Sequence, residues 1–392
     1  MESFAKVAQS IEQYVIKMRR KLHAHPETRW ETAWTREFIA GELRKMGLRP
    51  FTRLMQSGIF VDVDFLGVTE RILFRADFDA LPVPEKTRLP FASKVGGKSH
   101  ACGHDVGTAM LLGFLKAITQ KKIQLTHNLR IFFQDAEENP GTNPRPESGA
   151  EVAVQEGVCD GISNAYALHI DNLHDASLGI FRSRAEAMLG NSGRINFKVK
   201  SSGGHVAEPH AGVNALRVCN AIMNHLSGFI ARHFNPVQPA TLEPAVLNAG
   251  TGSNIMPAEA EMWWGFRTML SRPSHEAMAA LIEREIHQIA AACYAEITEV
   301  KLIHGHPALI CDRQVVEKTN ALLAAAGEQV AEINPLLGGE DFAHIAMRVP
   351  SALYMLGARG PNSGGDHHTP TFNPDESVFW RGVHFWLLLA TS

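Results

Sequence analysis

Hydrophobic and polar positions follow helical and strand periods in turn along the first half of the chain. Apolar residues recur every three or four positions over residues 11–22, which predicts an amphipathic helix ending near His25 and Pro26. Further helices are predicted at residues 34–46, 106–120 and 147–156, and strands at 59–65, 71–74, 129–133 and 165–169. Strands that alternate with helices favour an α/β fold with a sheet covered by helices.

The pattern changes near Met188. A run in the order βαββαβ is predicted from a strand at 194–199, a helix at 211–229, strands at 241–247 and 259–267, a helix at 274–292 and a strand at 296–303. From Pro307 the first pattern returns, with a helix at 313–326 and a strand at 351–356. We therefore predict an inserted domain at residues 188–303 within a discontinuous catalytic domain, residues 1–187 and 304–392.

Acids and imidazoles follow the strands of the first domain. Asp77 and Asp79 come just after one strand, Glu137 and Glu138 after the next, and His169 ends a third. Sites in open α/β sheets form at the carboxyl ends of strands. Each pair alone could be turn carboxylates, but their recurrence at strand ends favours a metal site.

A thiol and an imidazole lie close together before the apolar helix. Cys102, His104 and Asp105 fall within four residues, and thiolate and neutral imidazole are good ligands for zinc-like ions. A buried cysteine with a capping aspartate is the alternative without metal. Two ligands leave most coordination positions of an ion empty, so the other ligands must come from distant segments of the chain.

Composition excludes several function classes. The chain has 392 residues, 45% hydrophobic and 20% charged, with a net charge of −3, so no basic surface suggests nucleic acid. No apolar run reaches membrane-spanning length, and no secretory leader is visible. Five scattered cysteines argue against a disulfide framework. We expect a cytoplasmic protein.

Nine motifs, in order, are similar to those of one family. They are Arg19-Arg20 with Leu22 to Glu27, Arg75 to Pro82, His100 to Asp105, Phe133 to Glu138, Ala167 to His169, Gly203 to His205, Asn254 to Pro257, Gly339 to Phe342, and His368 to Pro370. Together they resemble the M20 metallopeptidases, in particular the amidohydrolase branch of aminoacylases, hippurate hydrolases and auxin-conjugate hydrolases.

The resemblance implies a site for two divalent ions, Zn²⁺, Mn²⁺, Co²⁺ or Ni²⁺. The implied ligands are Cys102, His104, Glu138, His169 and His368. Cys102 would bridge the ions, Glu137 would be the general base, and Asp79 would orient a ligand imidazole. The inserted domain would be a ferredoxin-like lid and dimerisation domain, from which His205, Asn254 and Arg267 would contact substrate. The resemblance also implies a homodimer, while His23 and His25 are assigned structural roles.

The chain departs from the family pattern near this site. Gly107 stands where a second histidine commonly follows, Asp135 replaces a common proline, and the loop 139–146 is longer than usual. His367 is a neighbouring alternative to His368, which we choose because it directly precedes Thr-Pro.

The predicted function is metal-dependent hydrolysis of the amide bond of N-acyl amino acids. Arg267 could pair with the free carboxylate of such a substrate. A dipeptidase or carboxypeptidase on the same scaffold is the first alternative. A non-catalytic binding module is the second, but such a protein should have lost Glu137 or a ligand.

Overall fold

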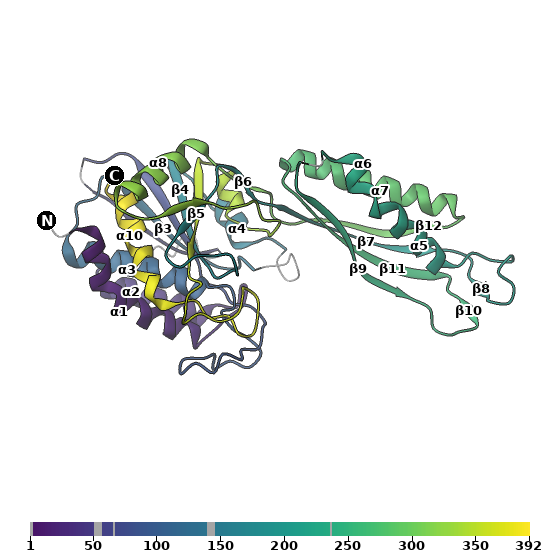
Figure 1. Ribbon diagram of the computed structural model, residues 1–392, viewed down its shortest axis with the longest axis horizontal. Coiled ribbons are helices and arrows are strands. Elements are labelled where there is room, and N and C mark those ends of the chain that lie inside the picture. Colours follow the sequence, from purple (N-terminus) through teal and green to yellow (C-terminus); the bar gives the residue numbers. More distant parts are fainter. Residues whose placement is uncertain (1–2, 51–56, 66, 139–145, 236) are drawn as a thin grey trace. The chain divides into compact units, whose positions relative to one another are not determined.

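A seven-stranded sheet forms the centre of the larger of two units into which the chain divides. The computed structural model describes residues 3–50, 57–65, 67–138, 146–235 and 237–392. Unit 1 comprises Met1–Glu186, Ile310–Asn334 and His344–Ser392, and unit 2 comprises Ala187–Leu309 and Pro335–Ala343. Figure 1 labels the elements of both units.

The order of strands in the unit 1 sheet is β1-β3-β2-β4-β15-β5-β14. The central strands β3, β2, β4 and β15 are mutually parallel, while β1 is antiparallel to β3 and β5 is antiparallel to β15. The carboxyl ends of the parallel strands therefore meet at one edge, where the predicted acids and imidazoles follow. The strands are β1 (Gly58–Val63), β2 (Arg71–Asp77), β3 (Asn128–Gln134), β4 (Asn164–Asp171), β5 (Phe181–Ser183), β14 (Val330–Glu332) and β15 (Ser351–Gly357).

Helices α1, α3 and α10 of unit 1 pack against one another. Helices α3 and α10 are apolar on almost every side and are correspondingly buried. The helical segments are α1 (Phe4–His23), α2 (Ala33–Lys45), α3 (His104–Lys121), α4 (Gly149–Gln155), α8 (Arg313–Ala325), α9 (Ala343–Ala346), the 3₁₀ turn η1 (Glu376–Val378) and α10 (Phe379–Ala390). A sheet flanked by helices confirms the predicted mixed α/β class.

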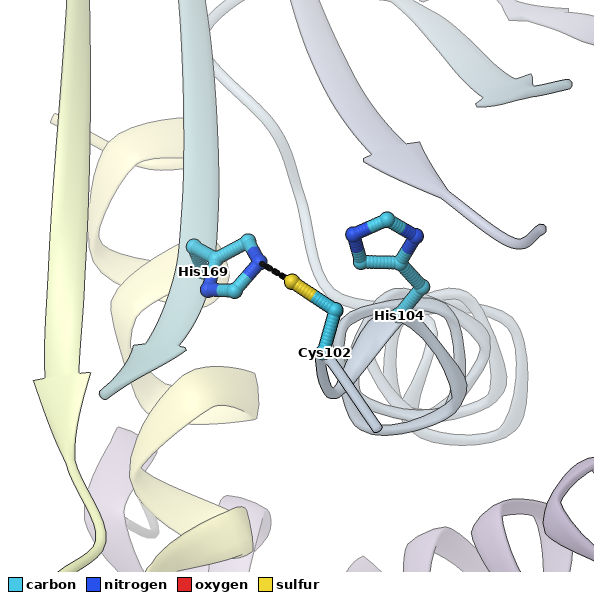
Figure 2. Close-up of side chains that lie close together, drawn as sticks. All are labelled: Cys102, His104 and His169. Carbon is cyan, nitrogen blue, oxygen red and sulfur yellow. Dashed lines mark hydrogen bonds between the residues drawn. The ribbon is translucent and has the colours of Figure 1, made fainter. Parts of the chain in front are cut away.

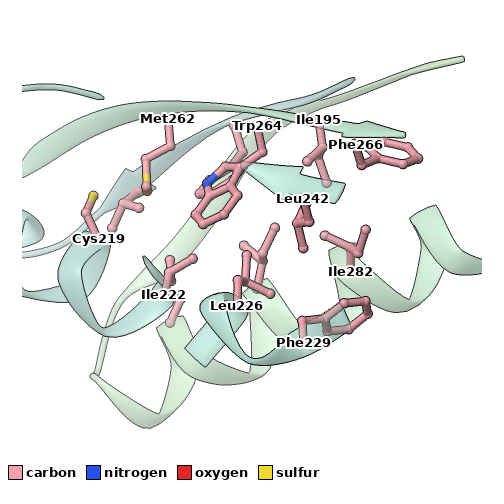
Figure 3. Packing of buried hydrophobic residues seen from close by; sticks show 14 of the residues in the cluster. Ile195, Cys219, Ile222, Leu226, Phe229, Leu242, Met262, Trp264, Phe266 and Ile282 are labelled. Atoms are coloured by element: carbon pink, nitrogen blue, oxygen red, sulfur yellow. The ribbon is translucent and has the colours of Figure 1, made fainter. Parts of the chain in front are cut away.

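Unit 2 contains a four-stranded antiparallel sheet of order β12-β7-β11-β9. Alternate residues of β7 and β11, among them Trp264, point into a core that helices α5 and α7 complete with apolar side chains such as Ile222 (Figure 3). The elements are β7 (Asn191–Lys200), β8 (Gly204–His205), α5 (Ala215–Ser227), α6 (Phe229–His233), β9 (Ala240–Ala249), β10 (Ile255–Met256), β11 (Glu259–Thr268), α7 (Arg272–Ala292) and β12 (Glu296–His304). Two further short strands, β6 (Glu186–Leu189) and β13 (Leu309–Cys311), occur where the chain passes between units.

Several element boundaries differ from the sequence prediction. Helix α3 begins at His104 rather than at 106, so this imidazole lies in the first helical turn. The helix predicted at 211–229 begins at Ala215, because the Asn214 side chain accepts the Leu216 N–H and caps it, and Gly228 separates it from α6. Strands β5 and β14 and helix α10 were not predicted. Within the described ranges, no helix combines the length and the apolar character that crossing a membrane requires.

Candidate metal centre

Cys102, His104 and His169 bring their ligand atoms together at the edge of the unit 1 sheet. Their side-chain donor atoms all lie within 4.8 Å of one another, with Cys102 Sγ 3.6 Å from His169 Nε2 (Figure 2). Gly103 turns the chain between the first two residues with a φ of 97°. A side chain there would be strained, and its Cβ would lie 2.2 Å from a methyl group of Ile170. The glycine thus allows the Cys102 and His104 side chains to face the same point.

Backbone carbonyls orient two of these imidazoles. His104 Nδ1 lies 2.9 Å from the carbonyl oxygen of Asp79, and His169 Nδ1 lies 2.6 Å from that of Ile170. A carbonyl oxygen only accepts, so each Nδ1 must carry a proton. In the neutral rings, Nε2 is then left with a lone pair, which is the arrangement found in metal-binding histidines.

Two further groups of donors overlap the first. Cys102, Glu138 and His368 form one, and His104, Glu137 and Glu138 form another, each with donor atoms within 4.8 Å. His368 Nε2 lies 3.2 Å from Glu138 Oε1. Because Cys102 belongs to two of the groups, its sulfur lies where it could serve two ions. Sulfur, nitrogen and oxygen donors in this combination fit zinc-like divalent ions.

His367 uses both ring nitrogens on the backbone. Nδ1 donates to the carbonyl of Cys102 at 3.0 Å, and Nε2 accepts the N–H of Asn172 at 3.0 Å. A neutral ring in this position has no lone pair left for a metal. The geometry therefore favours His368 as the histidine that faces the donor cluster.

Asp79 holds the two glutamates by their backbone. Its Oδ1 accepts the N–H of Glu137, and its Oδ2 accepts the N–H of Glu138, both at 3.1 Å. The expectation that Asp79 orients a ligand imidazole corresponds to its carbonyl contact with His104, while its carboxylate fixes the turn that carries Glu137 and Glu138. Glu137 itself is 9% exposed.

The charged groups of the cluster shift one another's pKa values. Burial opposes ionisation of Cys102, but His104 and His169 outweigh it and hold the thiol pKa well below its usual value. Burial likewise lowers the pKa of His169, yet Cys102 raises it to about 9. Hydrogen bonds with Cys102 and Glu138 raise the pKa of His368 to about 10. The site thus favours a thiolate that faces positive charge, and a thiolate is the form that binds metal.

Two of the unit 2 candidates lie close together at the short antiparallel pair β8–β10, His205 on β8 and Asn254 in the turn just before β10. His205 on β8 is exposed and its Nδ1 accepts the N–H of Ala207 at 3.1 Å, so the neutral ring carries its proton on Nε2. The N–H of Val206 donates to the carbonyl of Asn254 at 3.2 Å. Gly203 has a φ of 61°, and a Cβ there would lie 2.9 Å from the Met256 carbonyl, so the turn requires glycine.

Arg267 lies on β11, on the sheet face opposite the core. Its chain neighbours Phe266 and Thr268 are buried, whereas Arg267 is exposed. Partial burial of the guanidinium lowers its pKa. No ion pair or hydrogen bond to this guanidinium is found in the part of the chain that the structure describes, which leaves its donors available.

Comparison with known proteins identifies the family of the chain. The family model for peptidase family M20/M25/M40 matches residues 73–392. The chain belongs to this family. It is 30% identical to thermostable carboxypeptidase 1 of Saccharolobus solfataricus, over 100% of this chain and 98% of that protein. It is also 30% identical to N-acetyl-L-cysteine deacetylase of Bacillus subtilis, over 96% of this chain and 87% of that protein.

A solved structure extends the comparison. A Bacillus subtilis protein described as a dinuclear metal-binding peptidase of the M20 family superposes with a TM-score of 0.82 at 26% identity, covering 97% of this chain and 98% of that one. The M20 resemblance inferred from the motifs is thus confirmed, and the chain is a hydrolase of amide or peptide bonds.

One departure of this M20 chain, Asp135, has a local explanation. The N–H of Asp135 donates to the carbonyl of Ser57 at 2.9 Å, which a proline could not do, and its carboxylate binds Thr32 and Arg36. Most of the loop predicted at 139–146 lies outside the described residues.

The sequence placed Asp77 among the acids at strand ends but assigned it no individual role. Its Oδ2 lies 3.7 Å from His104 Nε2 and 2.7 Å from Arg75 Nη1. Burial would raise the Asp77 pKa, but Arg75 and His104 lower it to about 2. Its position beside Asp79 after an apolar strand was the available signal.

Proposed function

We propose that this protein is a metal-dependent amidohydrolase that cleaves the amide bond of N-acyl amino acids into a carboxylic acid and a free amino acid. The observation that supports it most is the pair of overlapping donor groups that share Cys102, with Glu137 beside them. In this proposal the metal ligands are Cys102, His104, Glu138, His169 and His368. Two divalent ions held there would supply Lewis acidity and a water of lowered pKa.

The chain's own residues would divide the remaining work. Glu137 would take a proton from the attacking water while the water oxygen forms a bond to the acyl carbon. The carbon–nitrogen bond then breaks, and Glu137 returns the proton to the leaving amine. Asp79 would keep Glu137 in place through the backbone bond described above. A water-excluded and preorganised environment favours such proton transfers because the surrounding groups need to reorganise little during the reaction.

Residues of unit 2 would bind the substrate. The Nε2 proton of His205 is suited to donate to the acyl oxygen as negative charge develops there. Asn254 would bind nearby, and Arg267 would pair with the free carboxylate. We further propose that unit 2 acts as a lid and that the protein is a homodimer in which His205 serves the partner's site.

A dipeptidase or carboxypeptidase activity is the second candidate. It is favoured by the full-length similarity to a carboxypeptidase at 30% identity. The two activities share the metal site and differ in what the pocket accepts, namely a simple acyl group or an aminoacyl group.

One experiment separates these possibilities. Protein stripped with a chelator is reloaded with Zn²⁺, Mn²⁺, Co²⁺ or Ni²⁺ and assayed on N-acetyl amino acids, N-benzoyl amino acids and dipeptides. The proposal expects metal-dependent release of the amino acid, with higher kcat/KM on N-acyl substrates. Arg267→Ala should raise KM for these substrates much more than for their amides, which lack the carboxylate. Activity that survives complete metal removal would contradict the proposal.

A further inference from the structure

Arg19 on α1 is a charged side chain that is completely buried in unit 1. Its guanidinium donates in three directions: from Nε to Asp105 Oδ2 at 3.0 Å, from Nη1 to Glu376 Oε1 at 3.2 Å, and from Nη2 to Asn373 Oδ1 at 3.3 Å. The ring of Phe91 lies 4.8 Å from the guanidinium carbon. A buried arginine is tolerated only where its donors are satisfied in this way.

The groups that Arg19 joins belong to two segments that carry proposed metal ligands. Asp105 directly follows His104 in the first turn of α3. Asn373 and Glu376 follow His368 on the C-terminal segment. The Arg19 side chain therefore connects the segment with Cys102 and His104 to the segment with His368. The two segments also touch directly, through the His368 N–H and the Ala101 carbonyl at 2.8 Å.

His23, one helical turn further along α1, supports the same carboxylate. Its Nδ1 lies 2.8 Å from Asp105 Oδ2, and its Nε2 lies 3.2 Å from Glu85 Oε1. The residue after Glu85, Lys86, donates its N–H to the carbonyl of Pro370 at 2.7 Å. This second route again connects the start of α3 with the segment that follows His368.

We propose that Arg19 is a positioning residue that sets the spacing between the two ligand segments, so that Cys102 and His368 meet at the same ions. This inference rests on the metal site proposed above. Arg19 does not touch the donor cluster itself, and it acts through Asp105 on one side and through Asn373 and Glu376 on the other. The planar guanidinium fork fixes direction as well as charge, which an ammonium group does not.

The decisive variant is Arg19→Lys in the full chain. Lysine keeps the positive charge beside Asp105 but cannot span all three acceptors. We expect the variant to bind Co²⁺ about 10–100-fold more weakly, the usual effect of losing a group that orients ligands. The thiolate-to-cobalt absorption band should change in energy or intensity. At saturating Co²⁺, kcat should fall while KM stays close to that of the unaltered protein.

Arg20→Lys is the matched control. Arg20 is the next residue on α1, also contacts Glu376, and also lies 4.8 Å from Phe91, but its side chain is 48% exposed and no bond to Asp105 is found for it among the described residues. We expect this variant to keep the cobalt affinity and the spectrum of the unaltered protein. Comparison of the two variants separates the effect of losing a contact with Glu376 from the effect of losing the connection between the Cys102 segment and the His368 segment.

Thermal unfolding of the metal-free proteins shows whether each variant folds. Should Arg19→Lys fail to fold, Glu376→Gln keeps the side-chain size and weakens only the C-terminal side of the connection, and a smaller loss of cobalt affinity is then expected. The inference would be overturned if the folded Arg19→Lys protein kept its cobalt affinity and spectrum unchanged. The same holds for Glu376→Gln where it is used in place of Arg19→Lys. If the unaltered protein itself gave no thiolate–cobalt band, the metal site would be refuted, and this inference with it.

Discussion

In unit 1, three imidazoles face a thiol and carboxylates, whereas in unit 2 the buried imidazole of His275 lies near an arginine and another histidine. Cys102 and the acids around it raise the pKa of His169 to about 9 and of His368 to about 10. Burial, together with Arg272 and His304, lowers the pKa of His275 to about 4. Neighbouring charge, rather than burial alone, decides which protonation state a buried histidine favours.

The contacts of His275 agree with a role in packing. Its ring stacks on Phe266 with centroids 4.7 Å apart, and Nδ1 lies 2.9 Å from Thr268 Oγ1. No thiolate or buried carboxylate is found beside it in the described part of unit 2. The comparison teaches that the number of histidines does not identify a metal site, since the same side chain packs in a buried position where no thiolate or buried carboxylate faces it.

The largest effect should come from replacing Glu137, which lies in the donor cluster of unit 1 but is not a proposed metal ligand. We expect Glu137→Gln to lower kcat by roughly 10²–10⁴-fold, because proton transfer is lost, while metal content is kept. Glu138→Gln is the contrasting variant and should lose metal affinity. Metal analysis and steady-state kinetics measure both. Near-normal turnover by Glu137→Gln would show that the base is misassigned.

The exposed imidazole of unit 2 provides the next test. His205→Ala should lower kcat by roughly 10²–10³-fold without changing metal content, since a donor to the developing oxyanion is lost. The neighbouring exposed His210→Ala serves as control and should remain active.

Mixing subunits sharpens this test. If His205 serves the partner's site, hybrids of His205→Ala with Glu137→Gln subunits contain one intact site, so activity returns after subunit exchange. Hybrids that stay inactive despite proven exchange would refute the action of His205 across the dimer.

His275 gives a smaller effect that depends on pH. Above pH 6.5 it is neutral in the folded and unfolded chain alike. As the pH falls from 6.5 to about 4, the unfolded chain takes up a proton that the folded chain excludes, so stability is lost in this window, by at most about 1.4 kcal/mol per pH unit. His275→Gln should flatten this part of the profile. Denaturant unfolding of the full chain at several pH values measures the difference, and equal slopes would contradict the assignment.

The smallest effect concerns Gly107 in α3, the position at which the family resemblance leads us to expect a second histidine. A Cβ there would meet the Leu168 carbonyl at 3.5 Å and Asp77 Oδ1 at 3.9 Å, which are ordinary contacts. Gly107→Ala should therefore stabilise the protein by about 0.5–1 kcal/mol through helix propensity and leave metal affinity unchanged. A lower melting temperature would mean that the ligand-bearing helix has no room for this methyl group.

Much of the fold follows from local patterns in the sequence. The bounds of the periodic helices and of the alternating strands were predicted to within a few residues. The class of the fold was also predicted. Helix α10 was not predicted because its short, mostly buried apolar run does not by itself distinguish a buried helix from a buried strand, and β5 and β14 were not predicted because each has only three residues.

The sequence by itself determined which residue types follow each strand, and from their order the family. Only the tertiary structure decided how these residues are arranged in space: that both ring nitrogens of His367 bond to the backbone, that the Asp79 carboxylate accepts the N–H groups of the two glutamates, and that Arg19 connects the two segments that carry proposed ligands. The physical reason is the sequence separation of the residues that interact. A periodic pattern depends on residues within one or two helical turns of each other. Arg19, in contrast, bonds to Asp105 and Glu376, which are 86 and 357 positions away, and only the packing of the whole unit brings these charges together.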